Sequence, residues 1–255
     1  IEGSLIQQWF SKKQPEVIKA VDNISFDLYP GEILGLVGES GCGKSTLSRT
    51  ILQLLQPTSG TVEFLGEDLT ALSPQAMRNQ RRQLQMIFQD PHACLNPLMT
   101  VGDSIAAPLL IHKLADAVKA KEHVATMLEK VGLTPVKEYY QRYPKELSGG
   151  QQQRVAIARA LITNPKLVIC DEPVSMLDAT VQTQVLKLML TLKEEFDLTY
   201  LFITHDLWVA RFFCDHIAVM NSGKIVEIDA TEKIFTQAQH PYTKKLLSAA
   251  PLLAK

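Results

Sequence analysis

The chain has 255 residues, of which 46% are hydrophobic and 21% are charged, and its net charge is −1. This composition is typical of a globular protein, and the length allows one large domain or a domain with a subdomain. The near balance of 26 basic and 27 acidic residues argues against a nucleic-acid surface. No run of about 18 apolar residues occurs, so no membrane-spanning helix is predicted.

The first ninety residues read as strands around one helix. Alternation of apolar and polar residues or short apolar runs indicate the strands. The helix follows a glycine-rich stretch and places Leu47, Ile51, Leu54 and Leu55 on one face. The predicted strands cover residues 23–28, 33–37, 61–64 and 84–88.

The pattern changes between residues 90 and 146. Residues 101–114 and 116–133 read as helices with no strand between them, and five apolar residues fall roughly on one stripe. We therefore expect an inserted helical subdomain here. The apolar stripe consists of Leu114, Val118, Met127, Leu128 and Val131.

The strand pattern resumes after residue 146. Strands alternating with helices indicate an α/β core. The final helix has Pro241 near its start, as helix N-termini often do. The predicted elements are a strand in 166–173, a helix over 179–196, a strand in 199–206, a hairpin in 216–228 and a helix in 240–251.

The four cysteines form no CxxC pair and match no zinc or iron–sulfur spacing. Unpaired cysteines favour a reducing, cytoplasmic setting. Cys170 lies in an apolar run and reads as a small core residue. For Cys42, which lies within the glycine-rich stretch, a reactive thiol and a small residue fitted to a tight turn are both open interpretations.

The stretch "GESGCGKS" fits the phosphate-loop pattern, with its defining residues at Gly38, Gly43, Lys44 and Ser45. Glycines let the backbone curl so that several N–H groups face one phosphate chain. The lysine can reach the terminal phosphates, and the serine hydroxyl can ligate Mg²⁺. A buried strand before the loop and an amphipathic helix after it are the context that this motif needs, so a nucleotide site is predicted.

Two acidic residues follow the apolar run "LVIC". This run places Asp171 and Glu172 at the carboxyl end of a strand, where ligands bind in α/β proteins. One carboxylate suits the metal shell, and the other suits polarisation of a water for attack on a γ-phosphate. Alone, such a pair could merely solvate a turn, but beside a phosphate loop the catalytic interpretation is favoured.

A second glycine-rich helix start occurs at "LSGGQQQRVAIARAL". Exposed N–H groups and the positive end of a helix dipole make such a start an anion-binding device. The chain thus has two candidate phosphate-binding helix starts about a hundred residues apart. We expect Ser148, Gly149, Gly150 and Gln151 to close over a nucleotide held by Lys44 of a second subunit.

The phosphate loop, "LSGGQ" and "CDEP", in this order, resemble the ATPase subunit of an ABC transporter over nearly the whole chain. The resemblance implies a single ABC ATPase domain over residues 1–255. Its α/β P-loop NTPase core, which is RecA-like, would comprise 1–89 and 147–255, with an N-terminal antiparallel β-subdomain and an α-helical subdomain over 90–146. It also implies ATP and Mg²⁺ as cofactors and hydrolysis to ADP and phosphate.

The family pattern assigns further residues in this chain. Gln89 matches the glutamine that contacts the metal and the γ-phosphate, and His205 matches the switch histidine. An aromatic residue near the N-terminus should stack on adenine, with Phe10 favoured over Trp9. The resemblance thus implies Glu172, His205 and Lys44 as catalytic residues, Ser45, Gln89 and Asp171 as metal ligands, and as ATP-binding residues Phe10, Gly38, Glu39, Ser40, Gly41, Cys42, Gly43, Lys44, Ser45, Thr46, Gln89, Ser148, Gly149, Gly150, Gln151 and Asp178.

Residues 89–105 and the stretch "HPYTKKLLSAAP" resemble the importer branch for peptides and nickel. The resemblance implies a second ABC ATPase subunit, integral membrane permease subunits and, indirectly, an extracytoplasmic solute-binding protein. The expected location is peripheral, on the cytoplasmic face of the inner membrane. Members of this branch often continue into a cysteine-containing segment, which this sequence lacks, so no iron–sulfur cluster is expected.

Other functions stay open at this point. The chain could be one half of a tandem ABC ATPase or a non-transport ABC ATPase, although residues 90–146 are too short for a long coiled coil and show no heptads. An exporter subunit would require that the chain is a fragment. A catalytically dead regulatory subunit is disfavoured because Lys44, Asp171, Glu172 and His205 are all present.

Overall fold

The computed structural model describes residues 19–249. Its main sheet has six strands in the order β4-β5-β6-β1-β7-β8, in which neighbours from β4 to β7 are parallel and β8 is antiparallel to β7. Two parallel neighbours cannot be joined by a tight turn, so longer connections that contain helices link the parallel strands. The strands are β1 (Ile33–Val37), β4 (Leu84–Ile87), β5 (Leu167–Asp171), β6 (Thr199–Thr204), β7 (His216–Asn221) and β8 (Lys224–Ala230).

Both faces of the sheet are buried, as the continuous apolar run of β1 predicts. Ile33 and Val37 enter one core together with residues of α7 (Gly149–Leu161) and α8 (Ala179–Phe196). Leu34 and Leu36 enter a second core, which includes Leu47 of α1 (Lys44–Ile51). The two glycine-rich helix starts therefore belong to helices on opposite faces of the sheet.

The helix after the phosphate loop is shorter than predicted. It ends at Ile51, and Gln53 has a left-handed backbone with φ of 52°. This conformation stops the helical register, because only the right-handed region continues an α-helix. Leu54 and Leu55 consequently leave the predicted apolar face and are exposed.

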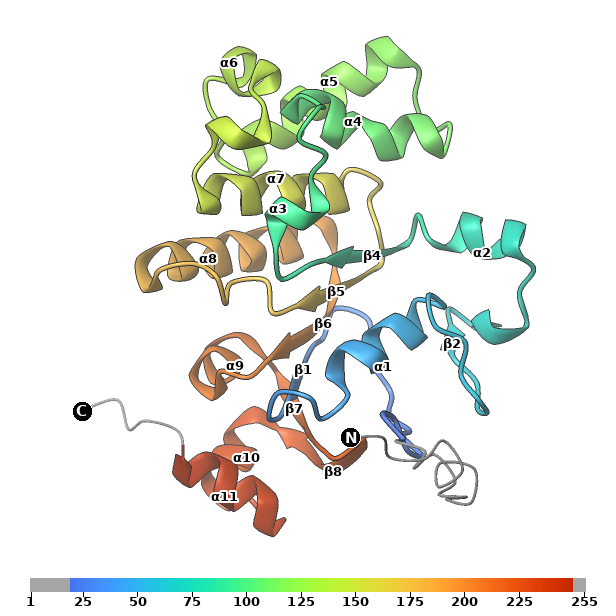
Figure 1. Cartoon of the computed structure of the whole chain (residues 1–255), viewed down its shortest axis with the longest axis vertical. Helices are drawn as coiled ribbons and strands as arrows, with labels where there is room; N and C mark the ends of the chain where they lie inside the picture. The colour runs from blue at the N-terminus through green and yellow to red at the C-terminus, as the bar shows by residue number, and fades with distance from the viewer. Residues whose placement is uncertain (1–18, 250–255) are drawn as a thin grey trace, which may run out of the picture.

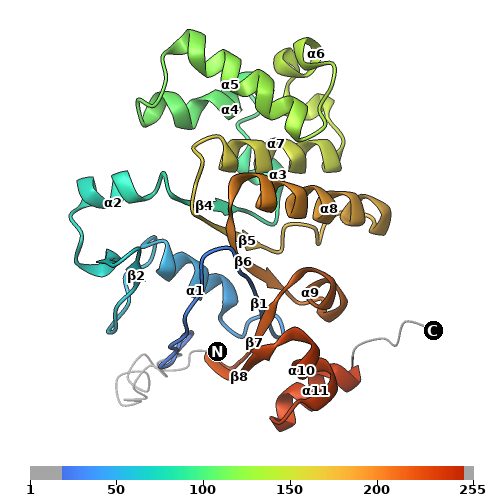
Figure 2. The same cartoon turned by 180° about the vertical axis from the view of Figure 1, so that it is seen from behind.

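A layer of helices lies between β4 and α7 in the chain and caps the β4 side of the sheet (Figures 1 and 2). Ile105, Val124 and Leu128 are fully buried in it. The predicted stripe was wrong at Leu114, which lies between two helices, and at Val118, because two residues turn a helix by about 200° and Ala120 is on the buried side. The helices are α3 (Pro91–Cys94), α4 (Val101–Ile111), α5 (Ala117–Lys130) and α6 (Val136–Gln141).

Within residues 19–249, the N-terminal β region is smaller than predicted. Its antiparallel pair consists of β2 (Glu63–Phe64) and β3 (Glu67–Asp68). Residues 23–28 keep the predicted alternation, with Ile24, Phe26 and Leu28 packed against the second core. They form no strand in the described part of the chain, because alternation reports a half-buried face and a strand also needs a backbone partner.

The predicted hairpin joins β7 to β8 through Ser222 and Gly223, which both have positive φ, at 46° and 82°. Two left-handed residues give the turn that matches the twist of a hairpin. In the range 19–249, no helix is both long and apolar enough to cross a membrane. The remaining helices are α2 (Pro74–Gln80), α9 (Leu207–Phe213), α10 (Thr231–Gln237), α11 (Pro241–Ala249) and the 3₁₀ segments η1 (Leu69–Ala71) and η2 (Pro144–Glu146).

Candidate nucleotide site

Four neighbouring parallel strands deliver the predicted site residues to one edge of the sheet. The phosphate loop begins at Gly38, directly after β1, and Gln89 follows β4 after one intervening residue. Asp171 is the last residue of β5, and His205 follows β6. Since these strands are consecutive in the order β4-β5-β6-β1, their carboxyl ends meet at the position where α/β proteins bind ligands.

The phosphate loop is supported from several sides. Gly43 has φ of 112°, and a Cβ atom there would lie 2.0 Å from the Ala20 carbonyl oxygen, so only glycine fits. The Cys42 carbonyl accepts a hydrogen bond from the Gly223 N–H at 2.9 Å, in the β7–β8 turn. These contacts from neighbouring segments support the curved backbone of the loop.

Lys44 is the first residue of α1 and is 5% exposed. Its Nζ donates to the carbonyl oxygens of Gly38 at 2.7 Å and Glu39 at 3.0 Å. A buried ammonium must have such partners, because an unpaired buried charge is costly. The ammonium group is therefore held in a fixed position within the curl of the loop.

Ser45 in α1 contacts Asp171 at the end of β5, with the Ser45 hydroxyl donating to Asp171 Oδ1 at 3.3 Å. Burial raises the pKa of Asp171, and the charge of Glu172 adds to this, although the hydrogen bond from Ser45 acts in the opposite direction. A half-buried carboxylate beside a hydroxyl is an oxygen-ligand set that suits Mg²⁺. The donor set present here thus fits the predicted metal.

Glu172 connects two other predicted residues. Its Oε2 lies 3.0 Å from His205 Nδ1 and accepts a hydrogen bond from Gln89 Nε2 at 3.2 Å. The backbone of Glu172 is left-handed, with φ of 49°, and its N–H donates to the Ile203 carbonyl at 2.9 Å. This turn after β5 brings the carboxylate between the ends of β4 and β6. Ser175, which the sequence reasoning missed, also accepts from Gln89 Nε2, at 3.3 Å.

The second glycine-rich stretch is an N-cap at the start of α7. The Ser148 hydroxyl accepts from the Gln151 N–H at 3.3 Å, and Gln151 Oε1 accepts from the Ser148 N–H at 2.9 Å, forming a capping box. Gln151 Nε2 donates to the Tyr139 hydroxyl at 2.9 Å, in α6. Figures 1 and 2 show α7 beyond β4 and α1 beside β1. Among the described residues, Ser148 and Gln151 make no hydrogen bond with the phosphate loop.

The start of α8 adjoins this cap. Asp178 is the N-cap of α8, and its Oδ1 accepts from the Val181 N–H at 3.0 Å. A Cβ atom on Gly150 would lie 2.5 Å from Val181 Cγ1, so the two helix starts are in tight contact. Asp178, Gly149 and Gly150 therefore form a group with Ser148 that is separate from the Lys44 group within one chain.

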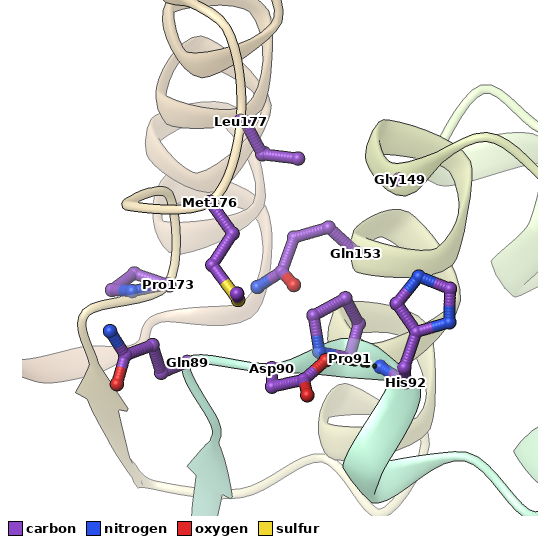
Figure 3. Close-up of a pocket in the computed structure, with 9 residues that line it drawn as sticks. All are labelled: Gln89, Asp90, Pro91, His92, Gly149, Gln153, Pro173, Met176 and Leu177. Atoms are coloured by element: carbon purple, nitrogen blue, oxygen red, sulfur yellow. Dashed lines mark hydrogen bonds between the residues drawn. The ribbon is translucent and has the colours of Figure 1, made fainter.

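A cavity of about 170 Å³ lies between the segment that follows β4 and the starts of α7 and α8 (Figure 3). Gln89, Asp90 and Pro91 line one side, and Gln153 of α7 points into the cavity from another. Gln153 is buried, and its Nε2 has no hydrogen-bond partner in the part of the chain that the structure describes. The sequence analysis did not single out Gln153. The signal that could have identified it is its position on the buried side of α7. Phe10 and Trp9, the candidates for adenine stacking, lie outside the described residues.

Comparisons with known proteins agree with this geometry. The family model described as "ABC transporter" matches residues 21–175. The chain is 52% identical over 237 residues to the oligopeptide transport ATP-binding protein OppF of Bacillus subtilis, covering 92% of this chain and 77% of that protein. This chain belongs to the ABC transporter family. It is also 51% identical over 235 residues to the glutathione import ATP-binding protein GsiA of Pectobacterium atrosepticum, covering 92% of this chain.

Solved structures of ABC cassettes share the fold. A dimeric cassette, MJ0796, in a post-hydrolysis state with ADP and phosphate has a TM-score of 0.76 and 31% identity, covering 86% of this chain and 94% of that one. The predicted α/β P-loop fold is thus confirmed, as is the resemblance to the peptide-importer branch of the ABC family. The ABC chain described here spans only 37% of the length of the glutathione import relative.

Proposed function

We propose that this chain binds and hydrolyses Mg-ATP as the nucleotide-binding subunit of an ABC import system. The observation that carries the proposal is the meeting of Lys44, Ser45, Asp171, Glu172 and His205 at adjacent strand ends. The alternatives of a tandem half or a non-transport ABC ATPase use the same site. The names of the importer relatives favour transport.

Each site residue has a separate task in this proposal. Lys44 and the loop amides bind the phosphates, and Ser45, Asp171 and Gln89 hold the metal. When bound, Mg²⁺ supplies charge neutralisation at the phosphates. Glu172 is the base that orients the attacking water, and the adjacent His205 contacts the γ-phosphate. Phosphoryl transfer to water needs positioning and a positive field more than covalent chemistry, which is what this residue set provides.

A second subunit completes each site. Ser148, Gly149, Gly150 and Gln151, with Asp178, would close over the γ-phosphate held by Lys44 of the partner. The separation of these two groups within one chain supports this arrangement. Because ATP then lies at the interface, ATP favours the closed dimer, and its hydrolysis lets the dimer open. The related cassettes include ones solved as dimers.

The proposed membrane partner binds the helical layer. A groove of about 400 Å³ lies between the core and α4, lined in part by Phe88, Met99 and Ile111. Leu98 is 85% exposed beside it, whereas Leu95 is buried. We assign the groove to a short cytoplasmic helix of a permease. The chain would then act at the cytoplasmic face of the inner membrane, with a solute-binding protein delivering the substrate outside.

Peptides are the proposed substrate class. The matched relatives are named for oligopeptide transport and for glutathione import, and glutathione is a small peptide. Substrate contacts would lie in the permease and the solute-binding protein. In this proposal the nucleotide site of this chain makes no contact with the peptide.

The ATPase proposal is tested with Lys44→Ala. Removing the ammonium group should abolish measurable ATP hydrolysis and weaken ATP binding, because the loop loses its only lysine among residues 38–46. Lys187→Ala, at an exposed position of α8, is the matched control. Hydrolysis at the wild-type rate by Lys44→Ala would refute the proposed site.

The permease proposal is tested by crosslinking. Leu98→Cys should crosslink to cytoplasmic permease loops in the co-expressed complex, since Leu98 is exposed beside the groove. Lys187→Cys on α8 is the control and should not crosslink. Crosslinks from the α8 position in the absence of any from Leu98→Cys would place the permease on another face.

A further inference from the structure

The stretch "HPYT" at residues 240–243 has no task in the proposed ATPase cycle, yet it is fixed firmly to the sheet. Glu227 of β8 accepts hydrogen bonds from the N–H groups of Gln239 at 2.7 Å and His240 at 3.1 Å. His240 Nδ1 in turn accepts from the Tyr242 N–H at 3.1 Å. Thr243 is buried. The first turn of α11 is therefore held in place by β8, and Tyr242 has a defined position.

Tyr242 reaches from α11 to the phosphate loop. Its hydroxyl accepts a hydrogen bond from the Glu39 N–H at 3.3 Å, between residues 203 positions apart in the chain. Burial raises the pKa of Tyr242, and the oxygen of the neutral phenol has lone pairs that can accept this bond. The contact thus joins the end of the described chain to the nucleotide site.

The same peptide unit also holds Lys44. The Glu39 N–H and the Gly38 carbonyl belong to one planar amide, and the Gly38 carbonyl accepts from Lys44 Nζ at 2.7 Å. Because the amide is rigid, fixing its N–H at Tyr242 fixes the direction of its carbonyl. Rotation of this peptide would break both hydrogen bonds and leave the buried ammonium with fewer partners.

We propose that Tyr242 is a positioning residue that sets the ATP affinity of the phosphate loop by fixing the Gly38–Glu39 peptide and, through it, Lys44. The inference rests on the proposed ATP binding. Bound phosphates hold the loop amides themselves, so the contribution of Tyr242 is largest before the nucleotide arrives. Its loss is expected to appear in the KM and Kd for ATP and much less in kcat.

Tyr242→Phe removes the hydroxyl oxygen and keeps the ring. Loss of one hydrogen bond should raise the Kd of a fluorescent ATP analogue and the KM for ATP by about three- to tenfold. The value of kcat should stay within about twofold, because saturating ATP restores the loop. Tyr29→Phe, at an exposed tyrosine, is the matched control and should change neither constant. An unchanged KM in Tyr242→Phe, or a fall in kcat alone, would overturn the inference.

A double-mutant cycle separates positioning from general destabilisation. In a Lys44→Ala background, Tyr242→Phe should change the Kd by less than about twofold, because residues that act through one another are not additive. The same fold-change in both backgrounds would show that Tyr242 does not act through Lys44. Failure of the wild-type chain to bind the analogue would instead refute the proposed function itself.

Discussion

Glu172 is the residue on which the proposed hydrolysis mechanism depends, and its carboxylate contacts both His205 and Gln89. Glu172→Gln keeps the size of the side chain but removes the proton acceptor. We expect ATP hydrolysis to fall by about 10²- to 10⁴-fold while ATP binding is retained. With ATP trapped at the interface, dimers should accumulate in size-exclusion chromatography. Glu194→Gln on the exposed side of α8 serves as the control, and near-normal turnover in Glu172→Gln would remove Glu172 from the mechanism.

At the scale of elements, the contact between the starts of α7 and α8 is tight at one glycine and ordinary at the next. A Cβ atom on Gly150 would lie 2.5 Å from Val181 Cγ1, whereas one on Gly149 would lie 3.5 Å from Leu177 Cδ2. Valine is stiff at χ1, so it cannot easily move aside. The two positions therefore differ in how they should tolerate alanine.

Gly150→Ala should lower the free energy of unfolding by about 1–3 kcal/mol, because it overpacks the helix contact. Gly149→Ala is the matched control and should be neutral or slightly stabilising, since alanine favours a helix over glycine. Val181→Ala should restore part of the lost stability in the double variant. Urea unfolding of the four proteins measures this, and equal stability of the Gly149 and Gly150 variants would contradict the packing described.

At the scale of the whole molecule, the proposed head-to-tail pair of subunits, with a two-fold axis between them, would explain the two glycine-rich helix starts. Each chain would contribute Lys44 to one site and Ser148 to the other. Lys44→Ala and Ser148→Arg then damage different halves of a site. Neither mutant homodimer has an intact site, whereas a mixed dimer has one site with both lesions and one whole site.

Coexpression of Lys44→Ala with Ser148→Arg should therefore restore some ATPase activity above that of either variant alone. Activity is measured on mixed dimers isolated through two different affinity tags. If Ser148 served the Lys44 of its own chain, every site in the mixture would be damaged, and the isolated mixed dimers would be inactive.

Local sequence signals predicted the elements that local chemistry determines. The apolar run of β1 and the helix α8, which begins after the capping residue Asp178, have the expected bounds. At the site, the strand-end positions of Asp171, Glu172 and His205 followed from apolar runs that stop before them. The task of each site residue, including adenine stacking by Phe10, stays a prediction.

Features that depend on distant contacts were not predictable in this way. Residues 23–28 alternate like a strand but have no strand partner in the described chain. Tyr242 meets Glu39 only because β8 carries α11 back to the loop, and no periodicity links positions 203 residues apart. Gln153 is buried in the fold, but a single glutamine in the run of three at the start of α7 does not stand out from its neighbours in the sequence.

The left-handed backbone of Glu172 implies that the residue best for the proposed activity differs from the residue best for stability at this position. Glutamate in this conformation costs about 1 kcal/mol, whereas glycine or asparagine adopts it more readily. Selection of random variants for thermal stability alone should therefore enrich glycine and asparagine at residue 172. The selected proteins should have higher thermal stability and no ATPase activity. If such a selection replaces Glu172, its presence in this chain would indicate that natural selection has favoured ATP turnover over stability at this position.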